Sequence, residues 1–410
     1  MKASPLTWAE VDLDAIGANT RALKRWVGER VEIIAVVKAD AYGHGAIPVA
    51  RTVLAAGASR LAVHRLGEGI ALRQAGIEAP ILVMAPLMPE EASEAVRWQL
   101  TPTLSTLEAA QALDAIARGA GRVVPVHVEV DTGMGRAGIS PEDTVDFLRA
   151  LRTMDGLMVE GLYTHFATAD ESDPSFTMRQ LRRFEEVIAV LESIGIRVPL
   201  HHAANSAATM RFRSAHFEAV RPGLALYGMR PSTEWEPPFP LHPAMTIKSR
   251  VTRVWTLAPG ESVGYGRTFV AERESRMALV PIGYGDGYPR ALSNRGYVLI
   301  RGQRAPVRGR VSMDQIVVDV TGISGVEVGD EVVILGRQGE AEIRAEELAA
   351  WAGTINYEIT TRISPPGPPD LSGRIHIARV VRALFVPLDP HEGFSEGWRP
   401  LKMAFHLSQA

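Results

Sequence analysis

The stretch VEIIAVVK, at residues 31–38, is an apolar, β-branched run that ends in a lysine, and a helical pattern follows it. The chain contains seven more such runs before residue 222, and amphipathic segments separate them. They are RLAVH (60–64), ILVMA (81–85), TPTLS (101–105), VVPVHVEVD (123–131), LMVEGLYTH (157–165), VPLHHAAN (198–205) and FEAVR (217–221). Eight strands that alternate with helices predict an α/β fold with a closed (β/α)8 barrel of the TIM type. An open, doubly wound sheet stays as the alternative, because a count of strands does not show closure.

The second half of the chain has a different rhythm. After a proline-rich stretch that begins near residue 232, short strand-like runs alternate with turns, which indicates a mostly antiparallel β domain. We therefore expect the barrel at residues 11–231 and a β domain that combines residues 1–10 with 232–370. The segment TWAEVDL (7–13) is expected to lend a strand to that domain. Residues 371–410 form a C-terminal extension, to which the sequence assigns no role.

Composition excludes several classes of protein. The 410 residues include 44 Lys and Arg against 47 Asp and Glu, a formal net charge of −3, without a long run of one sign. This balance argues against nucleic-acid binding and against a basic membrane-binding patch. The absence of cysteine excludes disulfides, thiolate metal sites and cysteine nucleophiles. Acidic residues near the N-terminus and the lack of an apolar run long enough to span a bilayer favour a cytoplasmic protein.

Polar residues gather where the predicted barrel strands end, which is where barrel enzymes assemble their active sites. The first strand ends in Lys38, the fifth in Glu129 and Asp131, the sixth in His165 and the eighth in Arg221. Only five of the 44 cationic residues are lysines. An arginine could supply a positive charge at the end of the first strand, whereas a lysine can also deprotonate to become an amine nucleophile.

The loops after the seventh and eighth strands, NSAA (205–208) and RPGLALYG (221–228), suit a phosphate group. Ser206 opens a helix and Gly223 permits close approach of the backbone, and phosphate-bearing ligands often bind at this position in such barrels. A phosphorylated cofactor on one side and the Lys38 amine on the other indicate pyridoxal 5'-phosphate, with the lysine as its Schiff-base partner.

Over roughly residues 5–365 the chain resembles the bacterial alanine racemases, which are pyridoxal-phosphate enzymes of fold type III. Nine ordered motifs carry the resemblance: AVVKADAYGHGA around Lys38, VDTGMGRAGI (130–139), YTHFATADE (163–171), HAANSAAT (202–209), RPGLALYG (221–228), VGYGRTF (263–269), PIGYGDGYPR (281–290), GRVSMDQIVVDV (309–320) and TINYEITTRI (354–363). The resemblance implies an enzyme that interconverts L-alanine and D-alanine and supplies D-alanine for peptidoglycan. It also implies a homodimer with shared active sites.

The resemblance assigns two acid/base groups. Lys38 is similar to the lysine that binds the cofactor and then serves one face of the substrate. Tyr265, in the β domain, is similar to the opposing base, which the partner subunit supplies; racemisation needs proton removal on one face and delivery on the other. Arg221 resembles the arginine that faces the pyridine nitrogen, where a permanent cation keeps that nitrogen unprotonated and suppresses transamination. His165 belongs to the hydrogen-bonded surroundings of these groups.

The other site residues also follow from the motifs. Arg136 resembles the residue that reaches the cofactor's phenolate oxygen and the substrate carboxylate, and Met313 resembles the one that offers its backbone N–H to that carboxylate. The residues that match the family's cofactor-binding and entrance-wall positions are Tyr42, Asn205, Ser206, Gly223, Leu224 and Tyr357. Supporting positions are Asp314, which follows Met313, and Tyr284 at the inner entrance.

The chain departs from the family at Glu129. Many members have a lysine there, modified to a carbamate that holds the arginine of GMGRAG, whereas a glutamate already carries a carboxylate. Period-two alternation directs Glu129 toward the barrel interior. We hypothesise that Glu129 pairs directly with Arg136; the alternative is an anion or water that fills the gap. No metal site is expected, because the adjacent His201 and His202 face opposite sides of their strand.

Two other functions stay open at this level. One is a racemase of the same fold with broader specificity, for example for serine. The bulky rings of Tyr265 and Tyr357, where the substrate side chain would lie, argue against it. The other is a non-catalytic pyridoxal-phosphate-binding protein, and the presence of a second domain with VGYGRTF and GRVSMDQ argues against that.

Overall fold

A closed barrel of eight parallel strands, β2 to β9, forms the first part of the molecule. The computed structural model describes residues 6–363 and, for the backbone alone, 374–378. The barrel strands are β2 (Glu32–Val36), β3 (Arg60–Val63), β4 (Ile81–Pro86), β5 (Thr101–Leu104), β6 (Val124–Glu129), β7 (Leu157–Tyr163), β8 (Leu200–His202) and β9 (Ala219–Val220). The pairing of β9 with β2 closes the ring. The predicted barrel is therefore confirmed, and the open-sheet alternative is wrong.

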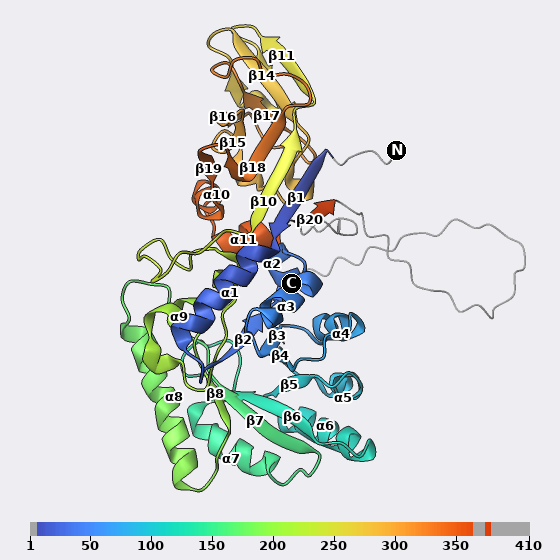
Figure 1. Ribbon diagram of the computed structural model, residues 1–410, viewed down its shortest axis with the longest axis vertical. Coiled ribbons are helices and arrows are strands. Elements are labelled where there is room, and N and C mark those ends of the chain that lie inside the picture. The colour runs from blue at the N-terminus through green and yellow to red at the C-terminus, as the bar shows by residue number, and fades with distance from the viewer. Residues whose placement is uncertain (1–5, 364–373, 379–410) are drawn as a thin grey trace, which may run out of the picture. The chain divides into compact units, whose positions relative to one another are not determined.

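Helices surround these strands (Figure 1). They are α1 (Leu13–Val27), α2 (Lys38–Gly43), α3 (Ala46–Ala55), α4 (Leu66–Gln74), α5 (Ala92–Arg97), α6 (Leu107–Gly119), α7 (Pro141–Leu151), α8 (Ser175–Ser193) and α9 (Ser206–Arg211). Several begin where a side chain accepts a free backbone N–H of the first turn. Asp12 does so for α1, Thr106 for α6 and Ser140 for α7. Such caps stabilise a helix by about 1 kcal/mol each, which sets where the helix begins.

The second half forms a mostly antiparallel sheet, as predicted. Its strands are β1 (Thr7–Asp12), β10 (Met245–Arg250), β11 (Arg253–Leu257), β14 (Ser275–Val280), β15 (Tyr297–Ile300), β16 (Gln303–Arg308), β17 (Ile316–Asp319), β18 (Glu331–Gln338) and β19 (Ala341–Ile343). A separate ribbon joins β12 (Ser262–Val263) to β13 (Phe269–Val270), and the helices α10 (Ala345–Ala352) and α11 (Asn356–Thr361) follow the sheet. The N-terminal strand β1 pairs with β10, so the expectation that residues 7–13 serve this domain is confirmed.

The other edge of β1 pairs antiparallel with β20 (Arg374–Ala378). This strand falls within the extension predicted at 371–410. The rest of that extension, residues 371–373 and 379–410, lies outside the described residues. The domain limits at 231 and 370 stay predictions.

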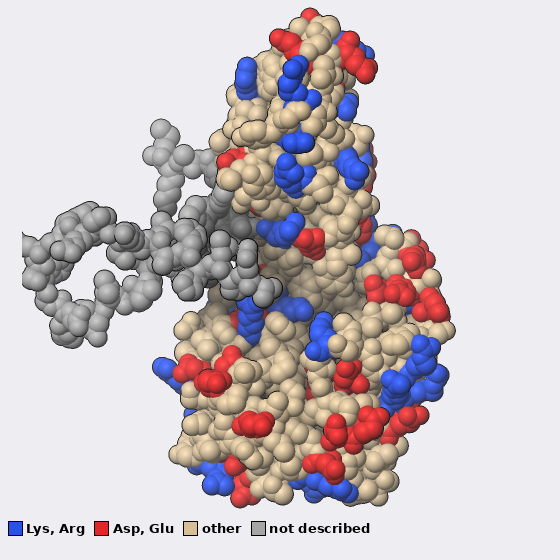
Figure 2. Space-filling view, turned by 180° about the vertical axis from the view of Figure 1, so that it is seen from behind, with Lys and Arg blue, Asp and Glu red and all other residues tan. Residues whose placement is uncertain are grey.

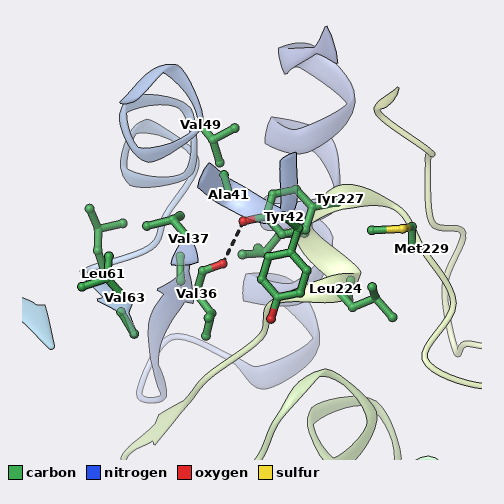
Figure 3. Packing of buried hydrophobic residues seen from close by; sticks show 14 of the residues in the cluster. Val36, Val37, Ala41, Tyr42, Val49, Leu61, Val63, Leu224, Tyr227 and Met229 are labelled. Atoms are coloured by element: carbon green, nitrogen blue, oxygen red, sulfur yellow. Dashed lines mark hydrogen bonds between the residues drawn. The ribbon is translucent and has the colours of Figure 1, made fainter. Parts of the chain in front are cut away.

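Aromatic packing fixes the backbone just after β2 (Figure 3). The fully buried Tyr227 donates its hydroxyl to the Val36 carbonyl at 2.8 Å, and its ring lies 4.9 Å from that of Tyr42. Gly43 has φ +84°, and a Cβ there would collide with the carbonyl oxygen of Thr360 in α11. A glycine is therefore required where α2 meets α11.

Acidic and basic side chains are interspersed on the face drawn in Figure 2. Among the helices of the described residues, none is both long and apolar enough to cross a membrane.

Candidate active site

A cavity of about 720 Å³ opens beside the C-terminal ends of the barrel strands. Eleven of the residues predicted for the site line it: Lys38, Tyr42, Glu129, Arg136, His165, Asn205, Ser206, Arg221, Gly223, Leu224 and Tyr357. Ligand pockets span about 300–1,000 Å³, so this one has room for a cofactor together with a small substrate. The fold therefore brings together residues that are up to 319 positions apart along the chain, from Lys38 to Tyr357.

Lys38 stands on an unusual backbone turn. The strand β2 ends at Val36, and residues 39–42 all have left-handed φ values between 51° and 56°. Each such residue that is not glycine costs about 1–2 kcal/mol. Glu68, at the start of α4, braces the turn by accepting the Ala39 backbone N–H at 2.6 Å. Strain of this kind persists where the surrounding structure fixes it, and it concentrates at functional sites.

The environment of Lys38 favours its neutral amine. Burial lowers the pKa of the lysine, and the nearby charge of Arg136 lowers it further, while Glu68 opposes both. A neutral amine is the form that attacks a carbonyl carbon or accepts a proton. The direction of this pKa shift therefore suits the role that the sequence predicted.

Hydroxyl and amide groups gather opposite Lys38, around Ser206. The Ser206 hydroxyl oxygen accepts the backbone N–H groups of Gly223 at 2.9 Å and Ala225 at 3.2 Å. A Cβ at Gly223 would lie 2.5 Å from the Tyr42 hydroxyl oxygen, so a larger residue would displace that phenol. Burial raises the pKa of Tyr42, and it raises the pKa of Tyr357 to about 12, so both phenols keep their protons. The hydroxyl groups of Ser206, Tyr42 and Tyr357 are the donors here that could bind a phosphate group.

Arg221 forms the floor of the site, and it is 3% exposed. Its Nη2 donates to the Thr164 carbonyl at 2.7 Å and lies 3.3 Å from His165 Nδ1, while its Nη1 lies 2.6 Å from His202 Nδ1. Burial, assisted by the charge of Arg221, lowers the pKa of His165 to about 3. A guanidinium keeps its proton in proteins, so the cavity faces a permanent cation beside a neutral imidazole.

Glu129 lies in the cavity wall but is not arranged as hypothesised. It is 6% exposed, and its carboxylate accepts the Tyr163 hydroxyl at 3.3 Å. Within the described part of the chain, Glu129 and Arg136 form no ion pair. In the loop that leads to Arg136, Asp131 accepts the backbone N–H groups of Gly133 and Gly135. Burial raises the pKa of Glu129, although Arg221 and Arg136 oppose that change.

Four predicted residues lie elsewhere, on the β domain. Tyr265 is 71% exposed, Met313 55% and Tyr284 44%, and Asp314 lies next to Met313. None of the four lines the cavity. The loops that carry Tyr284 and Met313 are joined by backbone hydrogen bonds, from Tyr284 to the Ser312 carbonyl at 3.1 Å and from Gly285 to the Met313 carbonyl at 2.8 Å. The predicted site is thus divided into a barrel half and an exposed half.

Sequence reasoning missed several lining residues, among them His64, Met84 and Tyr163. A signal existed for two of them: His64 ends the run RLAVH, and Tyr163 opens the motif YTHFATADE. The two adjacent histidines face opposite sides, as predicted: His202 reaches Arg221 inside the barrel, whereas His201 Nδ1 lies 3.0 Å from Glu218.

Comparison with known proteins agrees with this arrangement. The family models for the N-terminal and C-terminal domains of alanine racemase match residues 11–231 and 244–368. An alanine racemase of Halothermothrix orenii is 45% identical over 369 residues, which are 90% of this chain and 97% of that protein. One of Symbiobacterium thermophilum is 48% identical over 87% of this chain and 95% of its own length. The crystal structure of alanine racemase from Bacillus anthracis with bound L-Ala-P is 41% identical and has a TM-score of 0.84, covering 89% of this chain and 94% of that one. The chain belongs to the alanine racemase family.

Proposed function

We propose that this protein interconverts L-alanine and D-alanine with the help of pyridoxal 5'-phosphate, and that the D-alanine supplies peptidoglycan synthesis. The observation that carries the proposal is the cavity itself. A lysine of lowered pKa, a buried guanidinium and the hydroxyl groups of Tyr42, Ser206 and Tyr357 line one space, which supports the proposal. We also propose a cytoplasmic location, which is typical of the family.

The residues present fit the cofactor. Ser206, Gly223 and Tyr42 would hold its phosphate, Lys38 would bind its aldehyde carbon, and Arg221 would face its ring nitrogen. When bound, the cofactor supplies an electron sink that acidifies the Cα–H bond of an attached amino acid. Arg221 would limit that sink, because a permanent cation beside the ring nitrogen would disfavour its protonation.

The chain's own residues then move the proton. Lys38, whose pKa is lowered by burial, would accept a proton as the amine or deliver one as the ammonium on the face of the substrate that it approaches. Arg136 would bind the substrate carboxylate, since a guanidinium pairs well with that group. Tyr357 lines the cavity, where its ring packs on that of Tyr42 at a centroid distance of 5.9 Å. Together with Tyr265 it would narrow the space for the substrate side chain, which favours a methyl group over serine or larger side chains.

The second base requires a second copy of the chain. Tyr265 is exposed and does not line the cavity of its own chain, so we propose that it enters the cavity of a partner in a homodimer. Met313 and Tyr284 are exposed in the same domain and would accompany it. Two subunits would then share two complete sites.

The test is solvent-deuterium exchange in the cofactor-loaded enzyme. We expect the wild type to racemise alanine, Lys38→Ala to lose activity, and Tyr265→Phe to lose deuterium incorporation into L-alanine while exchange into D-alanine is comparatively spared. Tyr297→Phe, which changes a β-domain tyrosine packed on Trp351, serves as the matched control and should behave as wild type. A loaded wild type that leaves alanine of either hand unchanged would overturn the proposal.

A further inference from the structure

The interior of the barrel contains a chain of polar side chains beneath the site. The interior of a TIM-type barrel is ordinarily filled by branched apolar residues. Here Arg221 contacts His202, His202 Nε2 lies 2.9 Å from His127 Nδ1, and His127 Nε2 lies 3.2 Å from Glu160 Oε2. Both histidines are buried, and Glu160 pairs with Arg60 at 3.0 Å. Buried polar groups are retained at a cost of several kcal/mol unless every one is paired.

Hydrogen-bond chemistry gives this chain a single direction. A guanidinium can only donate, so the Nδ1 atom of His202 must accept from Arg221 and the ring must carry its proton on Nε2. That proton can point only to Nδ1 of His127, which therefore also carries its own proton on Nε2 and donates it to the Glu160 carboxylate. Each ring is thus held in one tautomer by the next group along.

The charge states agree with this direction. Burial lowers the pKa of both His202 and His127, with Arg221 adding to the effect, so both rings are neutral. The hydrogen bond from His127 is the largest cause that lowers the pKa of Glu160, with Arg60 contributing, so this carboxylate is ionised. Stacking fixes the rings further: the Tyr163 ring lies 4.9 Å from His202 at an interplanar angle of 10°.

We infer that Glu160, acting through His127 and His202, is a positioning residue for Arg221 and holds its guanidinium toward the cavity. The inference rests on the proposed function for its consequence, but the hydrogen-bond chain belongs to the protein alone. Loss of the terminal acceptor leaves the Nε2–H of His127 buried without a partner. The His127 ring then takes the tautomer that carries its proton on Nδ1, and this N–H faces the Nε2–H of His202. His202 in turn moves its own proton to Nδ1, where the N–H faces the N–H groups of Arg221 and repels the guanidinium.

The first test uses nitrogen NMR of ¹⁵N-histidine-labelled protein without cofactor, which reports the tautomer of each ring. We expect Nε2–H for both His127 and His202 in the wild type. Glu160→Met, which removes the acceptor, should shift both rings toward Nδ1–H, whereas Glu160→Gln retains an acceptor oxygen and should keep the wild-type pattern. The matched control is Glu218→Met, which removes the carboxylate beside His201 on the outer face of the same strand.

The second test uses the loaded enzyme. If Arg221 were displaced, it would no longer disfavour a proton on the pyridine nitrogen of the cofactor. The side reaction of transamination, in which the cofactor keeps the amino group and water supplies the oxygen of pyruvate, would then become more frequent. We expect Glu160→Met to raise the pyruvate formed per racemisation by about tenfold, the effect of one lost charged hydrogen bond, and Glu160→Gln to restore most of the wild-type ratio. Glu218→Met should not change it.

The outcomes separate the two proposals. A wild-type Nδ1–H tautomer at either ring would overturn the inference without any variant, even if Glu160→Met does not fold. A Glu160→Met enzyme with wild-type tautomers and a wild-type pyruvate ratio would overturn it as well. A wild type that shows the expected tautomers but does not racemise alanine would refute the proposed function alone.

Discussion

The division of the predicted site between two halves can be tested by subunit complementation. Lys38 lies in the barrel cavity, whereas Tyr265 is 71% exposed on the β domain and outside that cavity. Each variant, Lys38→Ala and Tyr265→Phe, removes one base from every site of its own homodimer. Neither homodimer should therefore racemise alanine. A mixed dimer, with one chain of each variant, can behave differently, because both substitutions can fall in the same active site and leave the other site intact.

The expected magnitude follows from counting sites. If Tyr265 serves the partner's cavity, one site of the mixed dimer lacks both bases and the other retains both. Mixed dimers should then have about half of the wild-type activity per dimer. If Tyr265 served its own chain, each site would lack one base, and the mixed dimer would be no more active than its parents.

The assay is co-expression of the two chains with different affinity tags, purification through both tags, and measurement of D-alanine formed from L-alanine. Lys38→Ala paired with Lys38→Arg is the control, since no arrangement of those chains restores a complete site. Recovery of no activity in tag-purified, cofactor-loaded mixed dimers would refute the shared site.

Three further predictions concern single positions. Gly223→Ala should weaken cofactor binding at least about tenfold, because the added Cβ would lie 2.5 Å from the Tyr42 hydroxyl oxygen and displace it. This magnitude corresponds to the loss of one charged hydrogen bond. Spectrophotometric titration measures the cofactor affinity, and an unchanged affinity contradicts the prediction. Glu129→Gln removes the buried charge that partly offsets Arg221 and should lower turnover about tenfold; wild-type turnover would show that the charge is not needed. Because burial lowers the pKa of His165 from 6.5 to about 3, the unfolded chain binds a proton there that the folded chain does not, and stability should fall as the pH drops below 6.5. The free energy of unfolding should fall by about 1.4 kcal/mol per pH unit. Urea unfolding at pH 7 and pH 5 should show a smaller fall in His165→Gln than in the wild type. An equal fall in the two proteins would exclude His165 as a cause.

Much of the fold could be predicted from the sequence, because all eight apolar runs became barrel strands and their polar ends converged on one cavity. The backbone around Lys38 could not. Residues 39–42 read ADAY, and nothing in those side chains indicates four successive left-handed residues. Tertiary contacts support the turn: Glu68 accepts the Ala39 N–H and Tyr42 packs on Tyr227. A pattern of residue types indicates which backbone conformations those residues prefer, whereas this turn has a backbone conformation that non-glycine residues disfavour.

Partner choice among the polar residues was equally hidden. Period-two alternation predicted that Glu129 faces the barrel interior. It did not show that His127 would turn to Glu160 and Glu129 to Tyr163, because those partners come from neighbouring strands whose register the sequence does not contain. The structure accordingly shows Glu129 hydrogen-bonded to Tyr163 and not paired with Arg136.

The barrel half and the exposed half of the predicted site contribute differently to folding stability. Variants in the two halves must therefore be interpreted differently. Residues around Lys38 are built into the barrel core, where a change alters packing as well as chemistry. Tyr265 lies at the surface between Gly264 and Gly266, both with left-handed φ, and contributes little buried area. Tyr265→Phe removes only the hydroxyl, so the unfolding free energy of the single chain should stay within about 0.5 kcal/mol of wild type, as for other surface changes. A loss of racemisation in Tyr265→Phe therefore reports proton transfer rather than folding, whereas a loss in a barrel variant needs a stability measurement beside it.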